Sequence, residues 1–166
     1  MINFLGEFNV TLDAKGRFLL PANFRKQLPE GLGERFVITR GFEKCLLLYT
    51  TDIWSPIADN ISVMNDMLPD VRNFKRLFLS PAAPVEVDSA ERIMIPKSLL
   101  EKGGITKEMV MVPAGNKMEL WDKDTYTEYE KQWEAGTYNE EGSGFSKLAS
   151  DIAEKHGNPF EIRKNG

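Results

Sequence analysis

Two short segments of the sequence each place an aspartate four residues before an arginine. The first reads LDAKGRFLLP from Leu12 to Pro21, and the second reads VDSAERIMIP from Val87 to Pro96. An aspartate carboxylate can accept hydrogen bonds from the amides of a tight turn and so hold its shape. The arginine just past the turn is then presented at a fixed place, where a guanidinium can pair with a guanine edge or a phosphate.

The two turns differ in the residues between the aspartate and the arginine. In the first turn, Lys15 adds a second cation at the tip, and Gly16 is free to take a positive φ. In the second turn, Ser89, Ala90 and Glu91 provide no lysine and one anion. Any exposed hairpin can carry aspartate and glycine for its turn and basic residues for solubility. The residues alone therefore leave a structural role as open as nucleic-acid binding.

The spacing of the two motifs indicates an internal repeat. A step of 75 residues carries Asp13 onto Asp88 and Arg17 onto Arg92, and the prolines that end the motifs also coincide. In each copy the apolar pattern predicts a hairpin around the turn, a short helix opened by the proline, and then a second hairpin. Because each unit is too small to stand alone in water, we predict an α+β fold with two pseudo-symmetric units that share one core.

Helices are predicted between and after the two copies. Apolar side chains recur at helical spacing in residues 53–64, after a cap at Thr51 or Asp52, and Pro69 opens a further helix. Asp122 can cap a later segment whose aromatic residues share one face, a pattern more typical of core packing than of a binding surface.

The C-terminal part continues as a glycine-rich loop over residues 135–144 and a last helix over residues 144–156. The resulting division of the chain is a first repeat at 8–54, a helical connector at 55–81, a second repeat at 82–125 and a C-terminal helical tail at 126–166.

The composition argues against most enzymes and against a cofactor. The single cysteine, Cys45, lies in the apolar run CLLLY, and the single histidine, His156, lies in a polar segment, so no zinc cluster or histidine-dependent catalysis is predicted. No glycine-rich phosphate loop or nucleophile elbow is visible. Asp13 and Asp88 are the one symmetric pair of carboxylates, and they are better explained as turn residues. The sequence therefore predicts no enzyme, no metal and no cofactor.

The charge distribution matters more than the net charge of −4. Residues 1–40 hold six basic and four acidic groups, whereas residues 122–166 hold six basic and ten acidic groups. The acidity belongs mainly to the C-terminal part, so the N-terminal part can approach a phosphate backbone. No apolar run approaches the roughly 20 residues that a bilayer requires, and the N-terminus lacks the features of a secretory signal. These features predict a cytoplasmic protein.

In these motifs the chain resembles the MraZ family of bacterial transcriptional regulators, whose subunits contain two repeats of the SpoVT/AbrB type of swapped-hairpin fold. The resemblance covers Phe4 to about Trp133 and is carried by LDAKGR with Pro21 and Arg25, CLLLY ending near Trp54, RNFKRLFLSPA at Arg72 to Ala82, VDSAERIMIP, and KMELW.

The resemblance implies sequence-specific binding to short direct repeats of double-stranded DNA upstream of division and cell-wall genes. It also implies a nucleoid-associated location and assembly into a homo-oligomeric ring. Carried over residue by residue, it assigns DNA contacts to Lys15 and Arg17 in the first motif and to Arg92 in the second. Asp13, Gly16 and Asp88 are then the residues that shape the two turns.

One residue departs from the family pattern. The family commonly has glycine before the second arginine, whereas this chain has Glu91, which puts a negative charge where a phosphate would approach. DNA contact by the second motif is therefore left open. The alternative function is a ring-forming scaffold for protein interactions without specific DNA binding, and binding of promoter DNA that depends on Arg17 would separate the two.

Overall fold

The computed structural model describes residues 2–138 and 144–162. The predicted loop at 135–144 and the predicted tail at 126–166 therefore extend in part outside the described residues. The first copy contains β1 (Phe8–Thr11), β2 (Arg17–Leu19), α1 (Ala22–Arg25), β3 (Arg35–Arg40), β4 (Leu46–Thr50), α2 (Thr51–Ser62) and α3 (Pro69–Phe78). The second contains β5 (Ala83–Glu86), β6 (Arg92–Met94), α4 (Lys97–Gly103), β7 (Glu108–Ala114), β8 (Lys117–Asp122), α5 (Lys123–Glu134) and α6 (Gly144–His156).

The two copies have the same order of elements, and their strands interlock. Six strands form one sheet in the order β1-β7-β8-β4-β3-β5, and β2 and β6 form a separate two-stranded sheet. The order of the large sheet reads the same from both ends when each strand is replaced by its counterpart in the other copy. The predicted α+β fold of two pseudo-symmetric units is confirmed.

The strands on either side of each turn do not pair with one another. Instead β1 pairs with β7, β2 pairs with β6, and β5 pairs with β3, so each of the two turns joins strands that pair with the other copy. The local hairpins that we predicted around the two turns are therefore wrong in their pairing, although both turns are present. Alternation of apolar residues specifies which face of a strand is buried, but it does not specify the partner strand.

One hydrophobic core is shared by the two copies. Phe18, Leu20 and Phe24 from the first copy pack with Ile93 and Ile95 from the second, and all five are at most 1% exposed. The core lies between the inner face of the large sheet and the layer formed by β2, β6 and the short helices. Because both copies supply its side chains, neither copy encloses a complete core by itself.

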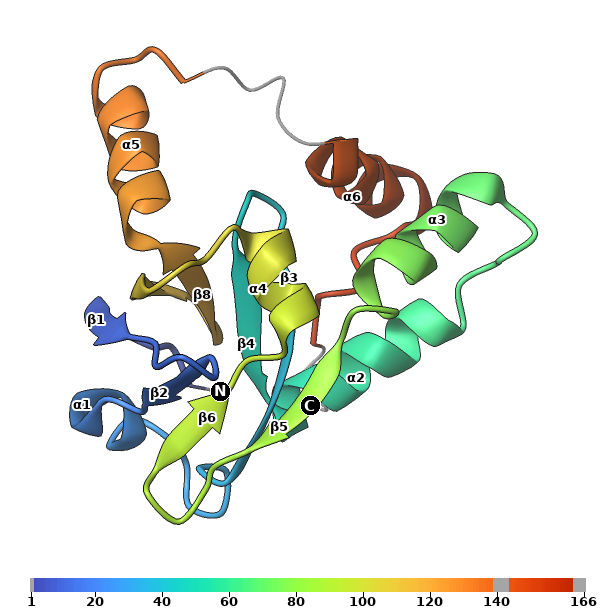
Figure 1. The fold of residues 1–166 in the computed structure, drawn as a ribbon. Helices are drawn as coiled ribbons and strands as arrows, with labels where there is room; N and C mark the ends of the chain where they lie inside the picture. The colour runs from blue at the N-terminus through green and yellow to red at the C-terminus, as the bar shows by residue number, and fades with distance from the viewer. Residues whose placement is uncertain (1, 139–143, 163–166) are drawn as a thin grey trace.

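The outer face of the large sheet is covered by two groups of helices (Figure 1). α2, α3 and α6 pack together over Leu47 and Tyr49 of β4, and α6 contacts α3. α5 covers another part of this face, beside β7 and β8 and away from α2 and α3, and there Tyr126 and Tyr129 pack against Trp121. Because α6 packs on the helices of the first copy, the counterpart of the α2–α3 pair is not formed beside α5.

The helix ends agree in part with the sequence. Asp122 caps α5, because its side chain accepts a hydrogen bond from the Thr125 amide, and Pro69 is the first residue of α3, as predicted. The predicted cap of α2 at Thr51 or Asp52 is wrong. β4 continues directly into α2, so the N-cap is Thr50, which has extended backbone and makes no side-chain capping bond.

Two of the predicted boundaries fall inside helices. The boundary between 54 and 55 cuts α2, and the boundary between 125 and 126 cuts α5. Among the described residues, none of the helices combines the length and the apolar character needed to cross a bilayer.

Candidate nucleic-acid interface

The first turn is organised by the carboxylate of Asp13. Its Oδ1 accepts hydrogen bonds from the backbone amides of Lys15 and Arg17, both at 2.9 Å, while its Oδ2 lies 2.7 Å from Arg17 Nε. Gly16 has a φ of +80°, in the left-handed region that glycine adopts without strain. One aspartate therefore shapes the turn and fixes the direction of the arginine that follows it.

The second turn repeats this arrangement almost atom for atom. Asp88 Oδ1 accepts from the amides of Ala90 and Arg92, both at 2.9 Å, and Asp88 Oδ2 lies 3.0 Å from Arg92 Nε. Glu91 occupies the position of Gly16 and has a φ of +62°. Because a side chain with a Cβ is strained in this region, the second turn adopts the glycine conformation at an energetic cost.

The hydrogen bonds keep both aspartates ionised. Hydrogen bonding from the Arg17 amide, assisted by the Arg17 guanidinium and the Lys15 amide, lowers the pKa of the Asp13 carboxyl below its usual value. The Arg92 and Ala90 amides and the Arg92 guanidinium lower the pKa of Asp88 in the same way. Each arginine is therefore held by a charged acceptor at neutral pH, through its Nε atom.

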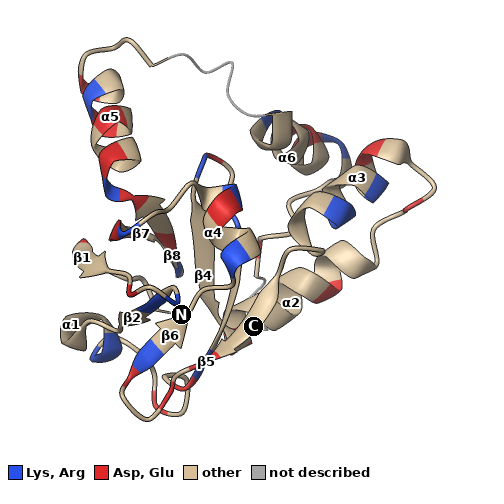
Figure 2. Cartoon of the chain, in the orientation of Figure 1, with Lys and Arg blue, Asp and Glu red and all other residues tan. Residues whose placement is uncertain are grey.

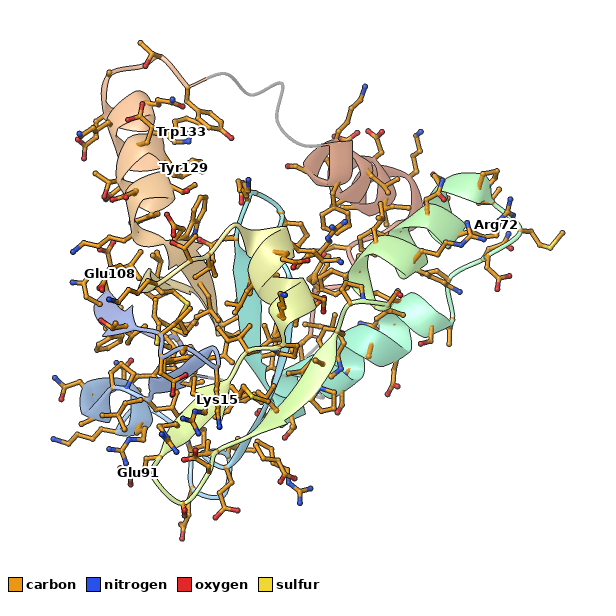
Figure 3. The ribbon with its side chains drawn as sticks, viewed as in Figure 1. Lys15, Arg72, Glu91, Glu108, Tyr129 and Trp133 are labelled. Atoms are coloured by element: carbon orange, nitrogen blue, oxygen red, sulfur yellow. The ribbon has the colours of Figure 1, made fainter. Side chains whose placement is uncertain are left out.

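The two arginines lie on one face of the two-stranded sheet. In β2 and β6, Phe18 and Ile93 point into the core, so the residues on either side of them point outward. Arg17 is directly opposite Met94, and Arg92 is directly opposite Leu19. The turns flank this short sheet, and Figure 3 marks them by Lys15 and Glu91.

The free groups on this face can recognise polyanions. Within the described residues, the side chain of Lys15 is exposed and forms no hydrogen bond or ion pair, while Arg17 uses only Nε. The Nη1 and Nη2 groups of Arg17 remain available, and an arginine can pair with guanine O6 and N7 through two such groups. Figure 2 shows basic residues on α1, β2 and β6, close to this face.

The two copies differ in the contacts of the left-handed residue. A Cβ placed on Gly16 would lie 3.0 Å from the Ile95 carbonyl oxygen and 3.0 Å from Leu100 Cδ1. In the second turn, Glu91 Oε1 instead forms an ion pair with Arg25 Nη1 at 2.7 Å. The repeat step carries Leu100 back onto Arg25, so a glycine–leucine contact in one half corresponds to an ion pair in the other.

This ion pair neutralises a basic residue beside the second turn. Arg25 was included in the family resemblance, but sequence reasoning did not assign it to the site. The pairing of Arg25 with Glu91 could have been suspected from the repeat, since the two copies differ at both positions: Gly16 corresponds to Glu91, and Arg25 corresponds to Leu100. Leu19 and Met94 were also missed, because an exposed apolar residue in a strand looks the same in sequence as a buried one.

Basic residues of the RNFKR segment have structural contacts instead. Arg72 Nη1 donates to the carbonyl oxygens of Asp66 and Met67, and Lys75 Nζ donates to those of Ser62 and Met64. These contacts hold the connection between α2 and α3. Arg72 lies far from the two turns in Figure 3, so it does not extend the basic face of β2 and β6.

One group of potential metal ligands is present in the described part of the chain. The ligand atoms of Glu43, Cys45 and Glu119 lie within 4.8 Å of one another. Burial raises the pKa of the Cys45 thiol and of both carboxyls, which favours the protonated forms that bind metals poorly. Glu119 also accepts a hydrogen bond from Trp121 Nε1 at 3.1 Å. We therefore interpret this group as packing between the β3–β4 loop and β8.

The sequence was compared with models of known protein families. A family model described as "MraZ protein, putative antitoxin-like" matches residues 3–77 and again residues 78–145. The two matches meet at the C-terminal end of α3, where the second copy of the element order begins. Together they cover most of the chain and place one turn of the candidate interface in each match.

Proposed function

The chain belongs to the MraZ family, and from this we propose that it is a transcriptional regulator that binds double-stranded DNA in a sequence-specific manner. Membership of this family supports a regulator-like, non-enzymatic role. The observation that carries the finer proposal is the pair of arginines, each held by its own aspartate, on one face of the β2–β6 sheet. We further propose that its sites are short direct repeats upstream of division and cell-wall genes.

In this proposal the first turn makes the main contacts with the DNA bases. Lys15 and Arg17 supply two cations, and Gly16 leaves no side chain between them. The second turn offers Arg92 alone, with Glu91 beside it. A two-stranded ribbon is narrow enough to enter the major groove, where arginine pairs with guanine, and the lysine at the tip can contact a phosphate.

Selection of DNA from a random-sequence duplex pool tests the proposed function, because the pool contains every candidate operator of the relevant length. The wild-type protein should enrich one short motif, present as a direct repeat. A protein that enriches no motif, while still folded by circular dichroism, would support the alternative of a protein-interaction scaffold and contradict sequence-specific binding. Binding must be measured at a stated salt concentration, because phosphate contacts weaken steeply with salt.

Replacement of Glu91 by glycine should tighten DNA binding several-fold. The change removes an anion from the face that approaches the phosphates and releases Arg25 from its ion pair. It also removes the backbone strain of a positive φ at this position, so the variant should be more stable than wild type. Mobility-shift titrations of wild type and variant on the selected duplex measure the change.

A second variant separates charge from backbone strain in this prediction. Glu91→Gln removes the charge but keeps a side chain at the strained position, so it should recover most of the gain in affinity and none of the gain in stability. If both variants bind DNA no better than wild type, the Glu91 carboxylate does not oppose binding.

We also propose that the chain assembles into a homo-oligomer, and the supporting observation is the open face of α5. α5 has no buried residue along its 12 residues, and Trp133 is 48% exposed, whereas α2 buries Ile53, Ile57 and Ile61. A groove of about 830 Å³ runs between α5 and α6 and is lined in part by Tyr129 and Trp133, both labelled in Figure 3. A second copy of the chain could cover these aromatic side chains. A closed ring would then present the first turns of several subunits to successive DNA repeats.

Light scattering should therefore give a mass that is a multiple of the 18.8 kDa subunit at micromolar concentration. Trp133→Ala should shift the protein towards smaller species, because it removes the largest exposed side chain of α5. Lys131→Ala, on the same helix but outside the groove lining, is the matched control and should leave the mass unchanged. A strictly monomeric wild-type protein would contradict the assembly.

A further inference from the structure

The outward face of the β2–β6 sheet carries two apolar side chains as well as two arginines. Leu19 is 58% exposed and Met94 is 53% exposed, and the repeat step of 75 residues relates one to the other. They are therefore a pseudo-symmetric pair, like the arginines. Apolar side chains at these exposed positions contribute nothing to the core beneath them, which is closed by Phe18 and Ile93.

The register of the sheet places each apolar residue beside an arginine of the other copy. Met94 is directly opposite Arg17, and Leu19 is directly opposite Arg92. Residues directly opposite in antiparallel strands have Cβ atoms about 4.5–5.5 Å apart. The face therefore offers a guanidinium and an apolar group as immediate neighbours, once on each side of its centre.

This combination matches the chemistry of one surface in particular. In the major groove, guanine presents two acceptors that pair with arginine, and the C5 methyl of thymine is the apolar group on the base edges. The exposed ammonium of Lys15 and the free Nη groups of Arg17 beside this face favour a polyanion.

We propose that Met94 and Leu19 contact thymine methyl groups in the major groove, next to the bases contacted by the arginines opposite them. This inference rests on the proposed DNA-binding function and adds a reading element to it. Arg17 and Met94 come from different copies of the repeat. The main base-contacting site is therefore built from both copies: the first provides the cation and the second provides the apolar contact.

Replacing thymine by uracil deletes only the C5 methyl and therefore tests the contact directly. The starting duplex is one that the wild-type protein enriches from a random-sequence pool, with each thymine replaced by uracil in turn. At one or two positions, uracil should weaken binding of the wild-type protein about fourfold, which corresponds to the ~0.8 kcal/mol of one buried methyl group. The remaining positions should be insensitive.

Variants of the protein then identify the residue that contacts the methyl group. Met94→Ala should weaken binding to the thymine duplex several-fold and should no longer distinguish thymine from uracil at the sensitive position, whereas Met94→Leu should retain the distinction. Met67→Ala makes the same chemical change at a methionine that is 78% exposed in the α2–α3 connection, and it should behave as wild type.

The outcomes separate this inference from the function on which it rests. Insensitivity to uracil at every position, with specific binding intact, would overturn the methyl contact but leave the DNA-binding function standing. Full discrimination by both Met94→Ala and Leu19→Ala would also overturn it, since some other residue would then read the methyl. Absence of any enriched duplex would instead refute the proposed function itself.

Discussion

Replacement of Arg17 by alanine is expected to abolish sequence-specific DNA binding while the fold remains intact. The guanidinium is anchored at Nε by Asp13 and makes no other hydrogen bond within the described residues, so its removal leaves the turn amides bonded to the aspartate. Loss of an arginine–base contact costs about 1–3 kcal/mol for each engaged subunit and relaxes sequence choice at that position. Mobility-shift titrations against specific and scrambled duplexes measure both effects.

Arg92→Ala is the matched variant, because it removes the same group from the equivalent turn. It should weaken binding less than Arg17→Ala, since Glu91 opposes the approach of phosphates at that turn. If either arginine contacts phosphate, its loss should reduce the slope of log affinity against log salt by about 0.9 per contact. If Arg92→Ala reduces DNA affinity more than Arg17→Ala, with both variants folded by circular dichroism, then the second turn makes the main contacts with the DNA bases.

Replacement of Gly16 by alanine should lower the free energy of unfolding by about 2–5 kcal/mol. A φ of +80° costs an alanine about 1–2 kcal/mol, and the added Cβ would also lie 3.0 Å from the Ile95 carbonyl oxygen and from Leu100 Cδ1. Crowding of this kind adds about 1–3 kcal/mol when the neighbours cannot move freely. Urea denaturation at one fixed protein concentration gives the difference from wild type.

Gly115→Ala provides the control for the Gly16 variant. Gly115 has a φ of +71°, but a Cβ placed on it would meet nothing within 4 Å. The control therefore carries the conformational cost without the crowding, and it should destabilise the protein by only about 1–2 kcal/mol. Equal effects of the two variants would show that the close approach of the two copies at Gly16 tolerates a methyl group.

The sequence was informative where structure is set locally. The start of α3 at Pro69 and the cap of α5 at Asp122 follow from side chains that act on their own backbone within a few residues. α6 occupies residues 144–156, as predicted. The repeat was visible because residues of special type, Asp, Arg and Pro, recur at a constant step.

Contacts between distant segments could not be predicted in the same way. The alternation in residues 8–12 fixes which side chains are buried, but pairing with β7 rather than β2 depends on the chain path between them. The packing of α6 against α3, rather than against α5, could not be predicted either. Both α3 and α5 carry apolar side chains that α6 could cover, so the choice depends on the tertiary fold. In the candidate interface, the sequence predicts the aspartate-stabilised turns. The exposure of Leu19 and Met94 and the pairing of Arg25 with Glu91 are seen only in the three-dimensional structure.

The interlocked pairing of strands has a consequence for synthesis of the chain on the ribosome. Phe8 of β1 pairs with Met111 of β7, about 100 residues later, and Phe36 of β3 pairs with Val85 of β5. β3 and β4 can pair with each other early, but β1 and β2 have no partner strands until β6 and β7 have been translated. Such long-range pairing is slow to form and leaves the nascent chain open to aggregation. A chain that terminates after α3 should be a substrate for chaperones and proteases, because it lacks the strands that complete its core.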